Sequence, residues 1–222
     1  GGILLADGLS LPANLRVGGE ATIPHAKTVT VKLDKNASIV TSGDGSYGIL
    51  AQSISGGGGI AGDTATLNLK YLSKSMPASR TGEASSKGGT VVVDVDGHIS
   101  TSGRNAQGIF AQSLSQGGGL SAGGMGSQVS GSIGKAGEIK IKLGERSPAS
   151  IRAKCAGSTG IVAQTMDASD KRVEISLKNN SLIEAETGVY MIGGDKYRNL
   201  SLDRSRIHAD TALLIKSSQD VN

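Results

Sequence analysis

The sequence predicts an all-β fold, a parallel β-helix with three short strands per coil, and three observations lead to this prediction. A six-residue motif, Gly-Ile-x-Ala-Gln followed by Ser or Thr, recurs at 48–53, 108–113 and 160–165. The segments before each copy alternate apolar and polar residues with a period of two, as half-buried strands do. The segments keep the same order in every copy, and such recurrence is typical of stacked repeats. A β-sandwich would not explain it.

Each repeat contains three expected strands in a fixed order. The first alternates around an apolar centre: Val31, Val93 or Ile141. The second carries one isoleucine at a constant distance before the motif: Ile39, Ile99 or Ile151. The third strand is the motif, whose isoleucines are expected to stack as an inward core column: Ile49, Ile109 and Ile161. One coil cannot bury its own apolar face, so the core would form only by stacking.

Two further copies keep the strand pattern without the motif, at 173–191 and 200–215. In both, the step from the middle strand to the third is four residues shorter. Near the start of the chain, residues 2–8 look like the last strand of a coil whose beginning is missing. The chain is therefore expected to be a single segment, 1–222, that is a fragment of a longer protein.

Runs of glycine follow the first two copies of the motif, at 56–59 and 117–119. Because consecutive glycines weaken strands and helices, two Gly/Ser-rich excursions from the stack are expected, at 55–89 and 115–137. The first contains a candidate strand around Leu67 and Leu69.

Polar residues of the motif are expected to form structural ladders. Identical amides or hydroxyls at the inter-strand spacing can bond to one another along the stack. The expected amide ladder is Gln52, Gln112 and Gln164, and the hydroxyl ladder beside it is Ser53, Ser113 and Thr165. A catalytic or sugar-binding role for these residues is the alternative interpretation.

Two outward rows of charge follow from aligning the first strands. Asp94 is expected between Lys32 and Lys142, and Asp34 beside Asp96. The two aligned carboxylates are weak candidates for a Ca²⁺ site, since Ca²⁺ prefers oxygen ligands, or for the acidic cluster of a polysaccharide lyase. A cross-strand charge ladder is the favoured interpretation. No metal, cofactor or catalytic residue is therefore predicted.

Composition excludes several classes of function. The net charge is +4 with interleaved signs, and aromatic residues make up 2% of the chain, so nucleic-acid binding has little support. The three histidines share no metal-ligand spacing, and no serine lies in a nucleophile elbow. Cys155 alternates with Ile151 and Ala153 and is expected to face the core. Phe110 and Tyr190 align on repeats and are the best candidates for a small sugar platform, although packing against an excursion loop is the favoured interpretation.

Two segments resemble repeats of large bacterial autotransporter passenger domains. The strings are Ile39-Val-Thr-Ser-Gly-Asp-Gly-Ser-Tyr-Gly-Ile-Leu-Ala-Gln-Ser-Ile-Ser-Gly-Gly-Gly-Gly59 and Ile99-Ser-Thr-Ser-Gly-Arg-Asn-Ala-Gln-Gly-Ile-Phe-Ala-Gln-Ser-Leu-Ser-Gln-Gly-Gly-Gly119. The resemblance implies a secreted, right-handed β-helix displayed on the surface of a Gram-negative bacterium. It also implies attachment, through a C-terminal region outside this segment, to a β-barrel in the outer membrane. It implies no enzymatic activity.

The expected function is a structural or adhesive segment that contacts other cells or a host. Its partner would be a host surface, a matrix molecule or another copy of itself. The alternatives are a polysaccharide-acting enzyme of β-helix type, which would use Asp34 and Asp96, and a passive spacer.

Overall fold

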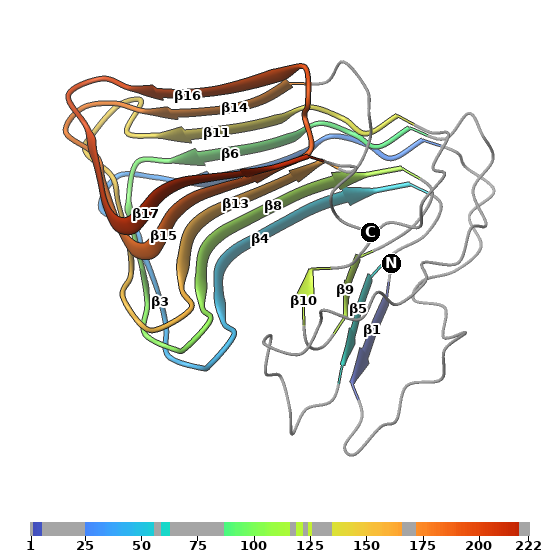
Figure 1. Ribbon diagram of the computed structural model, residues 1–222, viewed down its shortest axis with the longest axis horizontal. Coiled ribbons are helices and arrows are strands. Elements are labelled where there is room, and N and C mark those ends of the chain that lie inside the picture. The colour runs from blue at the N-terminus through green and yellow to red at the C-terminus, as the bar shows by residue number, and fades with distance from the viewer. Residues whose placement is uncertain are drawn as a thin grey trace.

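A computed structural model describes residues 2–5, 25–55, 59–62, 87–115, 119–121, 124–125, 135–165 and 172–217. Within these ranges every regular element is a β-strand. The strands form a five-stranded sheet, an eight-stranded sheet and a small four-stranded sheet (Figure 1).

The five-stranded sheet is parallel throughout and collects one strand from each repeat. Its strands are β2 (Val29–Leu33), β6 (Val91–Val95), β11 (Ile139–Leu143), β14 (Arg172–Leu177) and β16 (Tyr197–Leu202). Their order in space is β16-β14-β11-β6-β2. Val93 lies between Val31 and Ile141, so the predicted register of the first strands is confirmed.

The eight-stranded sheet is also parallel, and it combines the remaining strands. These are β3 (Ser38–Thr41), β4 (Tyr47–Ile54), β7 (His98–Thr101), β8 (Gln107–Leu114), β12 (Ser150–Ala153), β13 (Thr159–Thr165), β15 (Leu182–Ile192) and β17 (Arg206–Lys216). The order is β3-β7-β12-β15-β13-β8-β4, with β17 paired to β15. The first half of β15 pairs with β12 and the second half with β13. In Figure 1, β15 and β17 bend where this change of partner occurs.

The predicted fold class, a right-handed parallel β-helix with three short strands per coil, is contradicted by this sheet organisation. The positions expected to form a second and a third face belong to one sheet, because β15 and β17 each run through both positions as single strands of 11 residues. In the first three repeats, residues 42–46, 102–106 and 154–158 separate the two strands. The last two repeats are four residues shorter at this step, so no turn interrupts the strand. The fold is therefore an all-strand arrangement with two parallel sheets in its main body.

The small sheet contains β1 (Gly2–Leu5), β5 (Gly59–Gly62), β9 (Gly119–Ser121) and β10 (Gly124–Met125). β1, β5 and β9 are parallel, whereas β10 is antiparallel to β9. Strand β1, which belongs to the segment 2–8 expected to be the last strand of a coil, thus pairs with β5. Parts of the predicted excursions 55–89 and 115–137 are strands of this sheet, and most of their remaining residues, including Leu67 and Leu69, lie outside the described ranges.

The main core lies between the two large sheets. Alternate residues of β6, β11 and β14 are fully buried against isoleucines of the eight-stranded sheet. The isoleucines expected as a core column, Ile49, Ile109 and Ile161, occupy paired positions and are all buried. A second cluster covers the opposite face of β8 and β13: Phe110, Leu114, Val162 and Ile192.

The motif glycine is required by close approach between neighbouring turns. A Cβ at Gly108 would overlap Cγ2 of Ile151 and the carbonyl oxygen of Gly160. Equivalent overlaps occur at Gly48, Gly160 and Gly188. The isoleucine of the middle strand therefore fills the space that a side chain at the motif position would need, which explains why glycine recurs there.

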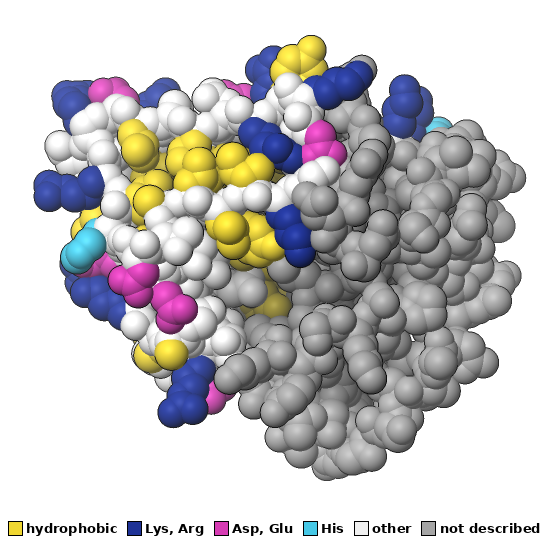
Figure 2. Space-filling model, viewed as in Figure 1, with side chains coloured by type: hydrophobic (Ala, Val, Ile, Leu, Met, Phe, Trp, Pro, Cys, Tyr) yellow, Lys and Arg dark blue, Asp and Glu magenta, His cyan; other side chains and the backbone are white. Residues whose placement is uncertain are grey.

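Strand β17 borders an open apolar face. Among the described strands it pairs only with β15, and β16 pairs only with β14. Their large apolar side chains are partly exposed: Leu202 (49%), Leu213 (40%), Leu214 (43%) and Ile215 (47%). Figure 2 shows hydrophobic side chains gathered on the face that these strands border.

Candidate functional site

The motif glutamines form a continuous chain of amide hydrogen bonds. Gln52, Gln112 and Gln164 occupy paired positions on β4, β8 and β13. Nε2 of Gln52 donates to Oε1 of Gln112 at 2.8 Å, and Nε2 of Gln112 donates to Oε1 of Gln164 at 2.8 Å. The next position in this column is Ile192, so the chain of bonds ends at Gln164. Gln112 and Gln164 are fully buried and therefore inaccessible to a substrate.

The hydroxyl column beside it connects the motif to the next turn of backbone. Ser53 Oγ donates to the carbonyl of Lys27 at 2.7 Å and accepts from the backbone N–H of Gly89 at 3.1 Å. Ser113 repeats this with Gly89 and Gly137 at 2.8 and 2.7 Å. Thr165 is aligned with Ser113, but its Oγ1 bonds to no described residue. The serines therefore satisfy backbone groups at a corner, a structural role.

The two carboxylates predicted as weak metal candidates are bridged by a side chain of the protein. Arg146 lies in the loop after β11, and its Nε donates to Oδ2 of Asp96 at 2.7 Å. Its Nη2 contacts Oδ1 of Asp34 at 2.9 Å. The guanidinium thus supplies the positive charge that an external cation would have supplied. Sequence reasoning did not identify Arg146, because it lies in a loop without the alternation that aligned the strands.

Asp96 also fixes the backbone of this loop. Its side chain is 2% exposed, and Oδ1 accepts from the N–H groups of Arg146 and Ser147 at 2.8 and 3.4 Å. Burial alone would raise the pKa of Asp96. The hydrogen bonds from Arg146 and Ser147, together with the charge of Arg146, outweigh burial and hold this pKa below its ordinary value. The carboxylate is therefore ionised and engaged, which is the wrong state for a general acid.

Other charged side chains on the sheets are arranged in rows of mixed sign. Asp94 lies between Lys32 and Lys142, although its Oδ1 accepts no hydrogen bond from a described residue. On the eight-stranded sheet, Glu184 contacts Arg152 at 3.0 Å and Lys154 at 3.3 Å. These rows neutralise themselves and present no isolated catalytic charge.

One exposed pair has the composition of a nucleophile and a base. Nδ1 of His98 lies 2.8 Å from Oγ of Ser150, its neighbour on β12. In the described part of the chain, no carboxylate is bonded to His98, and no group of three or more His, Cys, Asp or Glu could hold a metal. Without an orienting acid, the pair is a cross-strand hydrogen bond and not a catalytic dyad.

A column of three basic residues precedes the five-stranded sheet, and sequence reasoning missed it. His25, Lys87 and Lys135 lie on adjacent turns, joined by parallel bridges. Ala26 N–H donates to the carbonyl of Lys87, and Gly88 N–H donates to that of Lys135, both at 2.8 Å. All three side chains are exposed. The signal was available, since each residue stands four positions before the first strand of its repeat.

The expectation for Cys155 is wrong, and the disfavoured sugar platform at Phe110 and Tyr190 is absent from the described residues. Cys155 does not face the core: it lies in a turn, is partly exposed, and its Sγ contacts the carbonyl of Ser102. Phe110 is fully buried and packs edge-to-face against Tyr47, with ring centroids 5.8 Å apart. Phe110 and Tyr190 are separated by Val162 in the same column, so they form no exposed platform for a sugar.

Comparison with known proteins gives no family for this chain. No family model, no curated protein and no solved structure matches it. The described part of the chain contains no helix that is long and apolar enough to cross a membrane.

Proposed function

We propose that the chain is a structural and adhesive segment of a secreted bacterial surface protein. One observation carries the proposal: neighbouring turns pair in register over both large sheets, so that outward side chains form rows along the stacking direction. Such rows offer many weak, equivalent contacts, which add when a partner is also repetitive. The resemblance of 39–59 and 99–119 to autotransporter passenger repeats supports display on a Gram-negative cell surface.

The chemistry of the described residues favours contact over catalysis. The carboxylates that a polysaccharide lyase would use, Asp34 and Asp96, are bound to Arg146. Gln112 and Gln164 are buried within a chain of amide bonds. A lyase needs an accessible acidic cluster and a free base, so the enzymatic alternative has less support.

An adhesion assay tests this function. Cells that display the segment are compared with cells whose surface protein lacks 25–217, for aggregation and for binding to host-cell monolayers. Display must be equal, as measured with an antibody to a tag outside the segment. We expect binding to fall at least threefold without the segment. Equal binding would leave the passive spacer as the better description.

A further inference from the structure

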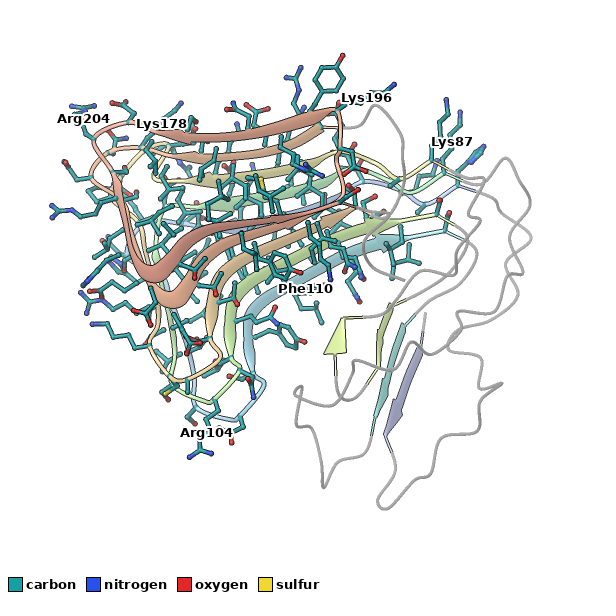
Figure 3. All side chains as sticks on the ribbon, in the orientation of Figure 1. Lys87, Arg104, Phe110, Lys178, Lys196 and Arg204 are labelled. Atoms are coloured by element: carbon teal, nitrogen blue, oxygen red, sulfur yellow. The ribbon has the colours of Figure 1, made fainter. Side chains whose placement is uncertain are left out.

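The basic column of His25, Lys87 and Lys135 differs from every other row of charge described above. Neighbouring parallel strands lie about 4.8 Å apart, so the residues of the column are neighbours along one line. In the rows of mixed sign on the two large sheets, an acid lies beside the bases, as Asp94 does between Lys32 and Lys142 and Glu184 does beside Arg152. No ion pair joins the three basic residues to a described acid. Figure 3 shows Lys87 pointing away from the strands, and its side chain is exposed.

Stacked like charges weaken a sheet. Like charges directly opposite each other on paired strands are destabilising. The backbone bonds from Ala26 and Gly88 nevertheless hold the column in line. A site that keeps two lysines, Lys87 and Lys135, adjacent at a cost in stability is suited to a ligand that brings negative charges at a similar repeat.

The surroundings of the column select among polyanions. The residues that follow the bases are Ala26, Gly88 and Ala136; Ala136 is buried and the other two are partly buried, so only the bases are exposed there. Lys27, two residues after His25, adds a further exposed cation beside the column. Lysine binds carboxylate and sulfate as a point charge without a fixed geometry. Single-stranded nucleic acid needs aromatic platforms, and none of these neighbouring positions has one.

We propose that His25, Lys87 and Lys135 form a binding site for an anionic polysaccharide, with carboxylate or sulfate groups along the stacking direction. This inference deepens the proposed adhesive function by naming the class of partner. Polysaccharide binding is measured on the purified chain and adhesion on whole cells, so the two results are independent. The chain can fail to bind polysaccharide while cells still adhere through another surface, and cells can fail to adhere while the chain still binds polysaccharide.

Biolayer interferometry with the full 222-residue chain provides the test, with immobilised polygalacturonate and heparin as probes and neutral dextran as the blank. We expect binding to both acidic polymers, weakened by added salt because the contacts are ionic. The double variant Lys87→Gln/Lys135→Gln should bind at least tenfold more weakly. The control Lys32→Gln/Lys142→Gln removes the same charge from the neighbouring sheet and should stay within twofold of the parent.

Thermal melts separate a lost site from a lost fold. We expect Lys87→Gln/Lys135→Gln to melt at or above the parent Tm, because like-charge repulsion is removed. Polygalacturonate should raise the Tm of the parent and leave that of the variant unchanged. The proposal is overturned if the parent binds neither polygalacturonate nor heparin. It is also overturned if the two double variants lose affinity equally. Tighter binding to single-stranded DNA than to polygalacturonate would also overturn it.

Discussion

Asp96 is the buried carboxylate on which the loop after β11 depends. Replacing it with alanine leaves the N–H groups of Arg146 and Ser147 without their acceptor, and an unsatisfied buried donor costs about 1–3 kcal/mol. We expect Asp96→Ala to lower the free energy of unfolding by about that amount in urea titrations. The control is Asp34→Ala, whose side chain is 74% exposed and whose loss should cost less than about 1 kcal/mol. Equal losses would contradict the anchoring role.

The same residue predicts a pH dependence. Because the pKa of Asp96 is lower in the folded chain, its stabilising contribution is fully present above the ordinary value of 3.8. It is lost as pH falls through the lower, folded value. The difference in unfolding free energy between the parent and Asp96→Asn should therefore shrink as pH falls from about 5 to 2. Chemical denaturation at several pH values measures it, and a constant difference would contradict the assignment.

Tyr47 should lose its phenolic proton at a higher pH than an exposed tyrosine. Burial disfavours its phenolate and raises its pKa to about 12. Its contribution to stability is present below the ordinary pKa, about 10, and is lost as pH rises through 12. In an ultraviolet titration, we expect Tyr47→Phe to remove the last phenolate to appear. Removal of an early phenolate instead would mean that Tyr47 is accessible.

Alternation and spacing were sufficient to predict which residues of neighbouring strands align, as the pairing of Lys32, Asp94 and Lys142 illustrates. They could not predict Arg146, whose position depends on a turn and not on a period. They also misplaced Cys155, because the alternation of β12 ends at Ala153, before the turn that holds the thiol.

Within the third strand of a repeat, the motif glycine has no space for a side chain. A methyl group at Gly108 would overlap Ile151 and the backbone of Gly160. Over-packing of this kind costs about 1–3 kcal/mol. We expect Gly108→Ala to lower the free energy of unfolding by that amount. Gly43→Ala is the matched control, since a Cβ there meets nothing within 4 Å. Comparable melts of the two variants would contradict the packing of Ile151 against the motif.

The existence of most strands followed from the sequence, but their grouping into sheets did not. Whether two consecutive strands belong to one sheet depends on the turn between them. The step after Ala185 lacks the turn found after Ala153, so β15 bends and stays continuous. The shorter spacing was visible in the sequence, yet its effect on the sheet required the backbone path. Strands β5, β9 and β10 had no alternation to reveal them, because glycine dominates these segments.

Across the whole molecule, the protection of backbone amides against hydrogen exchange should fall toward the face that β16 and β17 border. β11 is paired on both sides, by β6 and β14, whereas β16 pairs with β14 alone among the described strands. Local opening is easiest where fewer pairing and packing contacts must break. We expect the amide of Ile141 to exchange with deuterium at least tenfold more slowly than that of Leu200. Hydrogen-exchange mass spectrometry measures both, and uniform exchange would indicate that the sheet opens only as one unit.

The amide chain through β4, β8 and β13 also gives the molecule a direction. Gln52 and Gln112 each donate to the next higher-numbered repeat, and Gln164 accepts at the end of the row, so the carboxamides share one orientation. Inverting Gln112 alone would set two NH₂ groups against each other on one side and two oxygens on the other. The three amides can therefore reverse only in concert, and the row preserves its polarity against any single side-chain rotation.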